Sequence, residues 1–161
     1  AAGAAAARAA AAPITAVAQP VGADDAPLAP ARPRALVDGS NVAHATEGAG
    51  PRLANILLVR DRLSAQGFEV IVVADAALRH QIDDAEEYER LVHAGVIVQA
   101  PAGTDADYFL LSFARELEAS LVSNDRFRDR SRQFAEVHRH VILYMIMGDQ
   151  VFFERRTLRR T

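Results

Sequence analysis

Five aspartates follow the apolar runs of the chain at the points where those runs end. Asp38 comes directly after the run ALV, Asp75 after FEVIVVA and Asp125 after LVSN. Asp105 and Asp107 come shortly after the run VIVQ. Carboxylates that lie close together repel each other, and a hard divalent cation with oxygen ligands relieves that repulsion. If the runs are neighbouring strands, these aspartates form a candidate metal site.

The pattern around the aspartates predicts alternating strands and helices. Apolar runs rich in β-branched residues predict strands over 35–37, 68–74, 96–99, 121–123, 141–147 and 151–153. Amphipathic spacing predicts helices over 51–66 and 84–94, a helix opened by Thr104 and a short helix after 125. Such alternation is typical of an α/β three-layer sandwich with a mainly parallel central sheet and helices on both faces. The carboxyl ends of its strands meet at one edge, where such sheets bind ligands.

Each acidic segment also has a purely structural interpretation. The sequence DGSN at 38–41 is typical of a turn. Thr104 and Asp107 have the spacing of a capping box, and SND at 123–125 suits a helix N-cap. The argument for a site is therefore the arrival of all these acids at one sheet edge.

Three motifs resemble one known family in their order and spacing. VDGSNVAH (37–44), TDADYFLLSFA (104–114) and LVSNDRFRD (121–129) resemble the NYN domain of Zc3h12a-like (Regnase-like) ribonucleases, which belong to the PIN-like superfamily. The resemblance covers about residues 35–153. It implies a PIN-like, Rossmann-like fold and a metal-dependent ribonuclease, with an endoribonuclease expected. The implied substrate is single-stranded or loop RNA, cleaved to a 5′-phosphate and a 3′-hydroxyl.

The resemblance also implies roles for particular residues. Asp38, Asp107 and Asp125 would form an acidic metal site, with Mg²⁺ or Mn²⁺ as the cofactor. Asn41 would orient Asp38, and Asp129 is implicated in catalysis as well.

The chain departs from the family at one point. The family often has two adjacent acids before an aromatic residue, whereas this chain has Asp105-Ala106-Asp107. We align Asp107 with the second acid, so that Asp105 either replaces the first or caps the helix. Asp75 is a further candidate acid at the same edge. The CCCH zinc finger of the family is absent, in agreement with a cysteine count of 0.

Polar and basic residues beside the acids are candidates for contacts with RNA. These are Ser40, Ser123, Asn124, Arg79, Arg126 and Arg128. Residues 126–161 carry nine arginines against four acids, a net charge of +5, which leaves −8 of the total of −3 in residues 1–125. An acidic site beside an arginine-rich segment suits an enzyme acting on a polyanion.

Composition limits the remaining possibilities. The 161 residues have room for one domain with a core. Residues 1–34 are rich in Ala and Pro and predict a disordered tail or linker, which leaves 35–161 as the nuclease domain. The absence of cysteine excludes disulfides and thiol catalysis. No signal peptide or membrane span is recognised, so a cytoplasmic location is expected.

Three alternatives remain open at this point. The chain could be a catalytically inactive NYN-like module that binds RNA or protein, a toxin-type PIN nuclease, or a phosphohydrolase on a related scaffold. A phosphohydrolase is disfavoured because it needs a distant lysine, and the chain has none. A homodimer is possible, but no residue argues for it.

Overall fold

One six-stranded sheet, in the order β3-β2-β1-β4-β5-β6, forms the centre of the protein. The structure is a computed structural model and describes residues 31–155. The strands are β1 (Arg34–Asp38), β2 (Glu69–Ala74), β3 (Ile97–Gln99), β4 (Ser120–Val122), β5 (Val141–Met147) and β6 (Gln150–Arg155). The first five are parallel, and β6 returns antiparallel to β5. The predicted α/β class with a mainly parallel sheet is confirmed.

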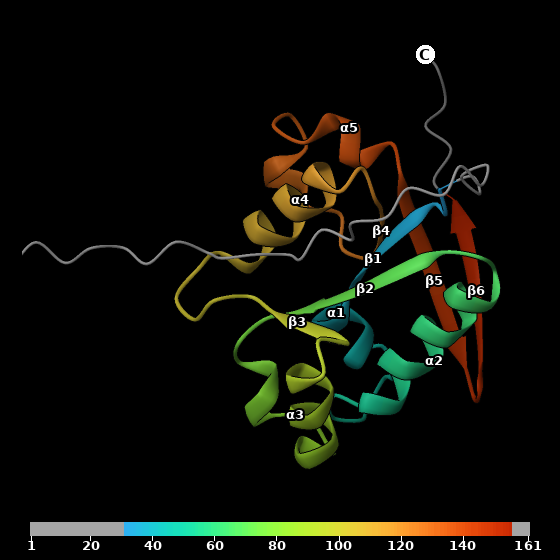
Figure 1. Ribbon diagram of the computed structural model, residues 1–161, viewed down its shortest axis with the longest axis vertical. Coiled ribbons are helices and arrows are strands. Elements are labelled where there is room, and N and C mark those ends of the chain that lie inside the picture. Colours follow the sequence, from blue (N-terminus) through green and yellow to red (C-terminus); the bar gives the residue numbers. More distant parts are fainter. Residues whose placement is uncertain (1–30, 156–161) are drawn as a thin grey trace, which may run out of the picture. The chain divides into compact units, whose positions relative to one another are not determined.

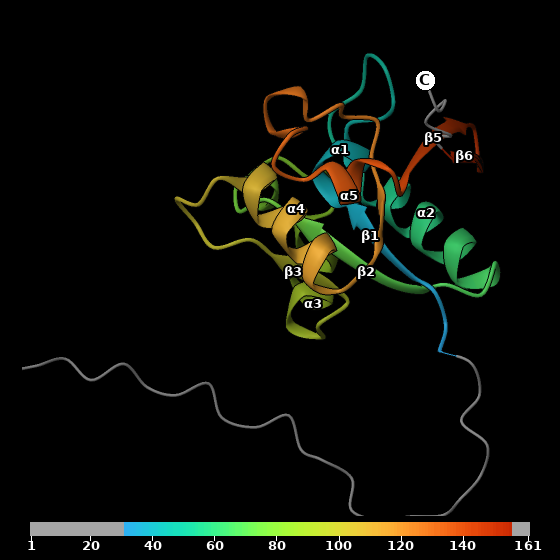
Figure 2. The same ribbon diagram turned by 90° about the horizontal axis from the view of Figure 1, so that it is seen from above.

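Helices cover both faces of this sheet (Figure 1). They are α1 (Gly39–Ala43), α2 (Leu53–Ala65), α3 (Ala85–His93), α4 (Ala106–Glu116) and α5 (Ala135–His138), with short 3₁₀ helices η1 (Leu78–His80) and η2 (Arg128–Arg130). In Figure 1 α4 and α5 lie above the sheet, and α2 and α3 lie below it. Seen from above, α4 and α5 lie side by side (Figure 2).

The alternation of side chains along β1 divides the interior into two cores. Ala35 and Val37 point into a core that includes residues of α1, α2 and α3, such as Ile56. Leu36 points into the other core, with Leu111 of α4 and Phe134. All six side chains are fully buried. A strand buried on both faces reads as a continuous apolar run, which is why β1 was recognisable in the sequence.

Two local predictions were wrong. The DGSN segment is not a turn but the start of α1, with Asp38 as its N-cap. The N-cap of α4 is Asp105 and not Thr104, because the Asp105 side chain accepts a hydrogen bond from Tyr108 N at 2.9 Å. In both places the sequence contains an aspartate, and aspartate is common both in turns and at helix N-caps. The sequence alone therefore did not show which of these roles each aspartate takes.

Part of the sequence prediction lies outside the described residues. The predicted tail falls on residues 1–34, of which 1–30 are not described, while Arg34 already belongs to β1. Within residues 31–155, no helix combines the length and the apolar character needed to cross a membrane.

Gly39 is required where α1 starts against the sheet. A Cβ atom at Gly39 would lie 2.9 Å from the backbone oxygen of Val73 and 3.0 Å from Cγ1 of Val72. A backbone atom cannot move away as the end of a side chain can, so any larger residue forces α1 away from β2. The glycine therefore allows Asp38 and α1 to sit directly on the strand ends.

We expect Gly39→Ala to lower the free energy of unfolding by about 1–3 kcal/mol, because it overpacks this contact. Gly50→Ala is the matched control, since a Cβ there meets nothing within 4 Å, and we expect a change within about 0.5 kcal/mol. Urea unfolding of the two variants beside the parent measures both. Equal stability of Gly39→Ala and the parent would contradict the close approach.

Candidate active site

The sheet topology brings Asp38, Asp107 and Asp125 to the carboxyl ends of the strands. β1 and β4 are neighbours in the middle of the sheet, and the chain order reverses between them. Asp38 ends β1, Asp125 follows β4, and Asp107 lies in the first turn of α4. Parallel sheets bind ligands at such a reversal point. We call these three residues the acidic edge.

Asp38 is the most enclosed carboxyl of the acidic edge. Its Oδ1 accepts from Asn41 N at 3.1 Å, and its Oδ2 accepts from Ser123 Oγ at 2.8 Å. Burial raises the pKa of Asp38 from the ordinary 3.8 to about 6, against the lowering effect of these two hydrogen bonds. The negative charges of Asp107 and Asp125 make a smaller contribution to the same rise. The three carboxyls are thus close enough to repel one another.

Asp107 experiences the same repulsion. The residue is exposed, yet partial burial of its carboxyl raises its pKa, followed by the negative charges of Asp125 and Asp105. Of the described residues, Arg130 acts in the opposite direction and lowers this pKa. Among the described residues, no ion pair neutralises any member of the acidic edge.

Ser123 joins Asp38 to the segment that carries Asp125. Its hydroxyl donates to Asp38 and accepts from Asp125 N at 3.1 Å. Asp125 Oδ1 in turn accepts from Phe127 N at 3.0 Å. The Ser123 side chain is fully buried, so its hydroxyl is committed to holding two acidic segments together.

Two adjoining hollows flank the acidic edge. One is lined by Asp38, Ser40, Asp75 and Asp107, with alanines and other apolar residues as its remaining wall. The other is lined by Asp105, Asp107, Asp125, Phe127, Arg128, Asp129 and Arg130. Asp107 borders both hollows. Asp129, predicted to take part in catalysis, is exposed and belongs to the second.

Asn41 contacts Asp38 through its backbone rather than its side chain. The side-chain Oδ1 of Asn41 accepts from Asn124 N at 3.0 Å and from the hydroxyl of Tyr144 at 2.7 Å. Sequence reasoning missed Tyr144, because its position in an apolar strand indicates only a core residue. The contact spans 103 positions, and no local pattern signals it.

Three polar residues near the acidic edge are engaged in local structure. Asp75 Oδ1 accepts from the backbone nitrogens of Ala77 and Leu78, both at 2.9 Å, and starts η1. Ser40 Oγ accepts from Asp75 N at 3.0 Å. Asp105 caps α4 and forms an ion pair with Arg130. Of the two interpretations of Asp105, the structure shows the helix cap.

The candidate RNA-binding arginines differ in their surroundings. Arg79 forms an ion pair with Glu89, with NH2 2.6 Å from Oε1. Arg126 and Arg128 are exposed, and no ion pair of either is found among the described residues. Phe127 between them is buried and has the left-handed backbone φ of 42°, unusual for a side chain of this size. This anchor turns its two basic neighbours toward solvent.

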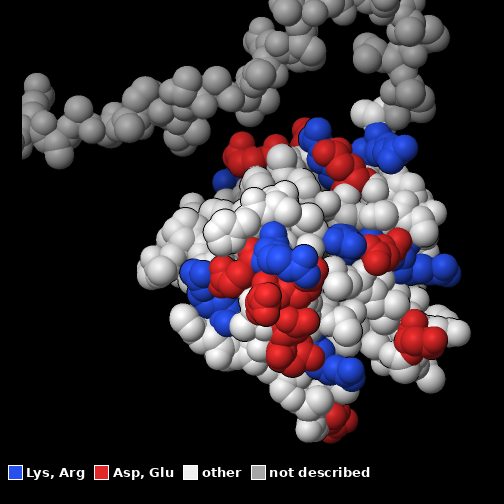
Figure 3. Space-filling model, turned by 60° about the horizontal axis from the view of Figure 1, so that its bottom comes forward, with Lys and Arg blue, Asp and Glu red and all other residues white. Residues whose placement is uncertain are grey.

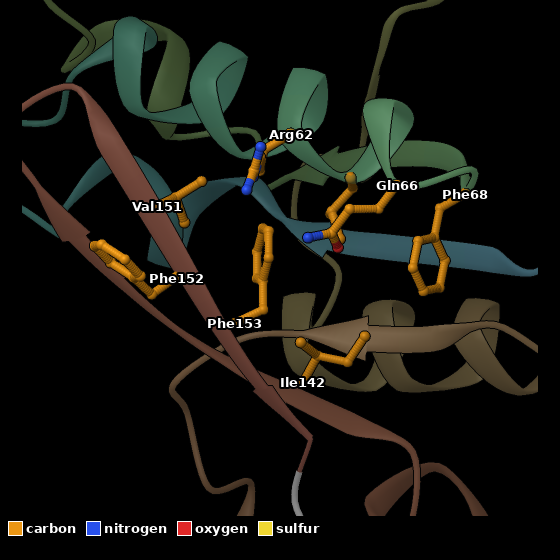
Figure 4. A pocket seen from close by; sticks show the side chains of 8 residues that line it. Arg62, Gln66, Phe68, Ile142, Val151, Phe152 and Phe153 are labelled. Carbon is orange, nitrogen blue, oxygen red and sulfur yellow. The ribbon is translucent and has the colours of Figure 1, made fainter.

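Other surface features lack the chemistry of the acidic edge. Figure 3 brings forward the side on which α3 lies, and acidic side chains gather there beside arginines. The acids of 83–89 have a structural explanation, since Asp84 caps α3 and Glu86 and Glu87 lie in its first turn. A hollow between α2 and the β5–β6 hairpin is lined mainly by apolar residues and contains no acid (Figure 4).

The donor set of the acidic edge fits a hard divalent cation. Its members offer carboxylate oxygens that repel one another, and in the part of the chain that the structure describes none of them forms an ion pair with an arginine. Among the described residues, however, no three His, Cys, Asp or Glu side chains are arranged to hold one ion together. Mg²⁺ commonly keeps several waters and uses only one or two carboxylates, so this arrangement suits a partly hydrated ion.

The raised pKa of Asp38 predicts how the free energy of unfolding of the metal-free protein depends on pH. The folded state binds the proton more tightly than the unfolded state, so stability is full below pH 3.8 and falls as the pH rises through about 6. The loss at neutral pH is about 3 kcal/mol. We expect Asp38→Asn to be more stable than the parent at pH 7.5 in EDTA by up to this amount, and the difference to shrink toward pH 4.

Thermal and urea unfolding at the two pH values measure this difference. Asp149→Asn, an exposed substitution in the β5–β6 turn, is the control for the loss of one negative charge. If Asp38→Asn were less stable than the parent at pH 7.5, the acidic edge would not be strained by repulsion and burial.

Comparison with known proteins agrees with the fold described above. Two structures of the nuclear protein-only RNase P 2 (PRORP2) of Arabidopsis thaliana resemble the chain. One has a TM-score of 0.62 at 20% identity, covering 78% of this chain and 30% of that one. The other has a TM-score of 0.60 at 19% identity, covering 77% and 30%. At this identity the likeness shows a shared fold, and this chain matches less than a third of the larger protein.

A search of curated proteins found no match. The family described as "Zc3h12a-like Ribonuclease NYN domain" matches residues 31–161, which include the whole sheet and the acidic edge. The chain therefore belongs to the Zc3h12a-like ribonuclease NYN domain family, within the PIN-like fold.

Proposed function

We propose that this protein is a metal-dependent ribonuclease that hydrolyses phosphodiester bonds of single-stranded RNA at the acidic edge, most simply as an endoribonuclease. The observation that carries the proposal is the convergence of Asp38, Asp107 and Asp125 from three separate segments, with no ion pair to any of them among the described residues. Membership of a ribonuclease family gives the reaction class. We further infer a cytoplasmic location, and leave a homodimer as an open possibility.

The acidic edge would hold Mg²⁺ or Mn²⁺, through Asp38 and through Asp107 or Asp125, with water as the remaining ligands. When bound, such an ion lowers the pKa of a coordinated water and offsets negative charge on the scissile phosphate. Asp129 lines the same hollow as Asp125, which supports a role for its carboxylate in acting on a bound water. Asn41 and Ser123 hold Asp38 through hydrogen bonds to both of its oxygens.

RNA would approach the acidic edge along the exposed pair Arg126 and Arg128, which we call the basic border. Arg126 and Arg128 are exposed beside Asp125 and suit phosphate contacts. Arg79 would have to leave Glu89 to make such a contact, so we assign it a smaller part. The hydroxyl of Ser40 remains a candidate for a contact with the sugar or phosphate, and the backbone carbonyl of Asn124 for one with a sugar hydroxyl, since its N–H already donates to Asn41.

Removal of any carboxylate of the acidic edge should abolish cleavage. We expect Asp38→Asn, Asp107→Asn and Asp125→Asn each to lower kcat for a labelled single-stranded RNA by at least about 100-fold, because each loses negative charge needed to hold the cation. Asp149→Asn should cleave like the parent. The full chain is assayed with Mg²⁺, with Mn²⁺ and in EDTA, and EDTA should stop the reaction.

Two outcomes would argue for other functions. Equal cleavage by Asp38→Asn and the parent would remove Asp38 from the site. Binding of RNA without cleavage in any metal would support an inactive NYN-like module instead.

The basic border makes a separate prediction about binding. We expect the double substitution Arg126→Ala and Arg128→Ala to raise KM about tenfold and leave kcat at saturating RNA unchanged. Each lost phosphate contact should reduce the slope of log K against log salt by about 0.7 for single-stranded RNA. Fluorescence anisotropy in EDTA at several salt concentrations measures the slope.

Arg79→Ala should have a smaller effect, and Arg62→Ala, in the hollow between α2 and the hairpin, is the control for general charge. An unchanged salt slope in the double variant would show that RNA does not pass over this border.

A further inference from the structure

The side chain of Asn124 takes the place of a strand residue beside β5. The last backbone contact between β4 and β5 is from Ser123 N to Ile142 O at 3.2 Å. At the next step the side chain of Asn124 continues the ladder, donating from Nδ2 to Tyr144 O at 2.9 Å and accepting from Tyr144 N at 3.1 Å. The backbone of Asn124 is thereby freed to turn toward α1.

The side chain of Asn41 accepts hydrogen bonds from both Asn124 and Tyr144. Its Oδ1 accepts from Asn124 N at 3.0 Å and from the Tyr144 hydroxyl at 2.7 Å. The three residues therefore form a closed ring of hydrogen bonds that joins α1, the end of β4 and the middle of β5. We call this ring the Asn41–Asn124–Tyr144 clamp.

The clamp is adjacent to both ends of the acidic edge. The backbone nitrogen of Asn41 donates to Asp38, and Asn124 directly precedes Asp125. A rotation of Asn41 would release the first turn of α1 from the end of β4. Beyond the pairing of β1 with β4, the hydroxyl of Ser123 would then be the remaining described side-chain link between Asp38 and the segment of Asp125.

We propose that Tyr144 is a positioning residue: its hydroxyl locks Asn41 against Asn124 and so fixes the separation of Asp38 and Asp125 that the cation requires. The inference rests on the proposed function, because it assumes that the acidic edge binds a cation.

The surroundings of Tyr144 suit a fixed donor. Only 6% of Tyr144 is exposed, and its ring belongs to the core below the sheet. Burial first, and then the negative charge of Asp38, raise the pKa of Tyr144 above its ordinary value, so the hydroxyl keeps its proton. A phenylalanine ring would fill the same space in the core. Packing therefore explains the ring of Tyr144 but not its hydroxyl.

Tyr144→Phe in the full chain tests the hydroxyl while keeping the ring. We expect kcat for single-stranded RNA to fall about 10-fold, with KM for RNA within about twofold, because the loss is in positioning and not in RNA binding. The Mn²⁺ concentration for half-maximal activity, and the Mn²⁺ dissociation constant measured by electron paramagnetic resonance without RNA, should each rise several-fold.

Tyr88→Phe is the matched control. Tyr88 is also fully buried, and among the described residues its hydroxyl has no hydrogen-bond partner, so its removal should leave kcat and Mn²⁺ affinity unchanged.

A double-mutant cycle separates positioning from a general structural effect. In an Asn41→Ala background, Tyr144→Phe should cause no further loss, because the acceptor is already gone. An undiminished effect in that background, or a Tyr144→Phe variant with the parent's kcat and Mn²⁺ affinity, would overturn the proposal. If Tyr144→Phe does not fold, Asn41→Ala alone must show the same loss of Mn²⁺ affinity, and normal affinity would overturn it.

A parent chain that binds Mn²⁺ but does not cleave RNA would refute the proposed ribonuclease. The Mn²⁺ affinities of the variants would still decide the role of the clamp.

Discussion

Repulsion among carboxylates at the carboxyl edge of a parallel sheet is the constraint on which this structure depends. Asp38 is half-buried, and Asp107 and Asp125 add negative charge beside it. Such an arrangement disfavours ionisation in the folded state, yet within residues 31–155 none of the three forms an ion pair with an arginine. Selection for stability alone would remove this repulsion. The arrangement is explained if the acidic edge binds a cation, as proposed, because the cation would relieve the repulsion.

The surrounding hydrogen bonds fix the positions of these charges. Both oxygens of Asp38 accept a hydrogen bond from a group that is itself held by another element, Asn41 in α1 and Ser123 after β4. Gly39 lets α1 lie against the end of β2, so the first turn of that helix is held between the sheet and the clamp. The site is built on rigid elements, and its exposed arginines stand on a loop anchored by Phe127.

The sequence predicted the local parts of this design better than the distant ones. Runs such as FEVIVVA identify their strands because β-branched residues are enriched in strands, and the predicted 68–74 differs from β2 by one residue. The acids were found because strand ends share an edge. The helical state of the DGSN segment was missed, because its residues suit a turn as well as an N-cap. The bond from Tyr144 to Asn41 depends on the order of β1, β4 and β5 in the sheet, which no short pattern encodes.

The most direct test of the central claim is a crystal structure of the full chain grown with Mn²⁺, with the ion located by its anomalous scattering. The acidic edge should hold at least one ion, with a carboxylate oxygen of Asp38 and one of Asp107 or Asp125 in its coordination shell or hydrogen-bonded to its waters. Manganese bound elsewhere on the surface, with the acidic edge empty at saturating concentration, would contradict the account.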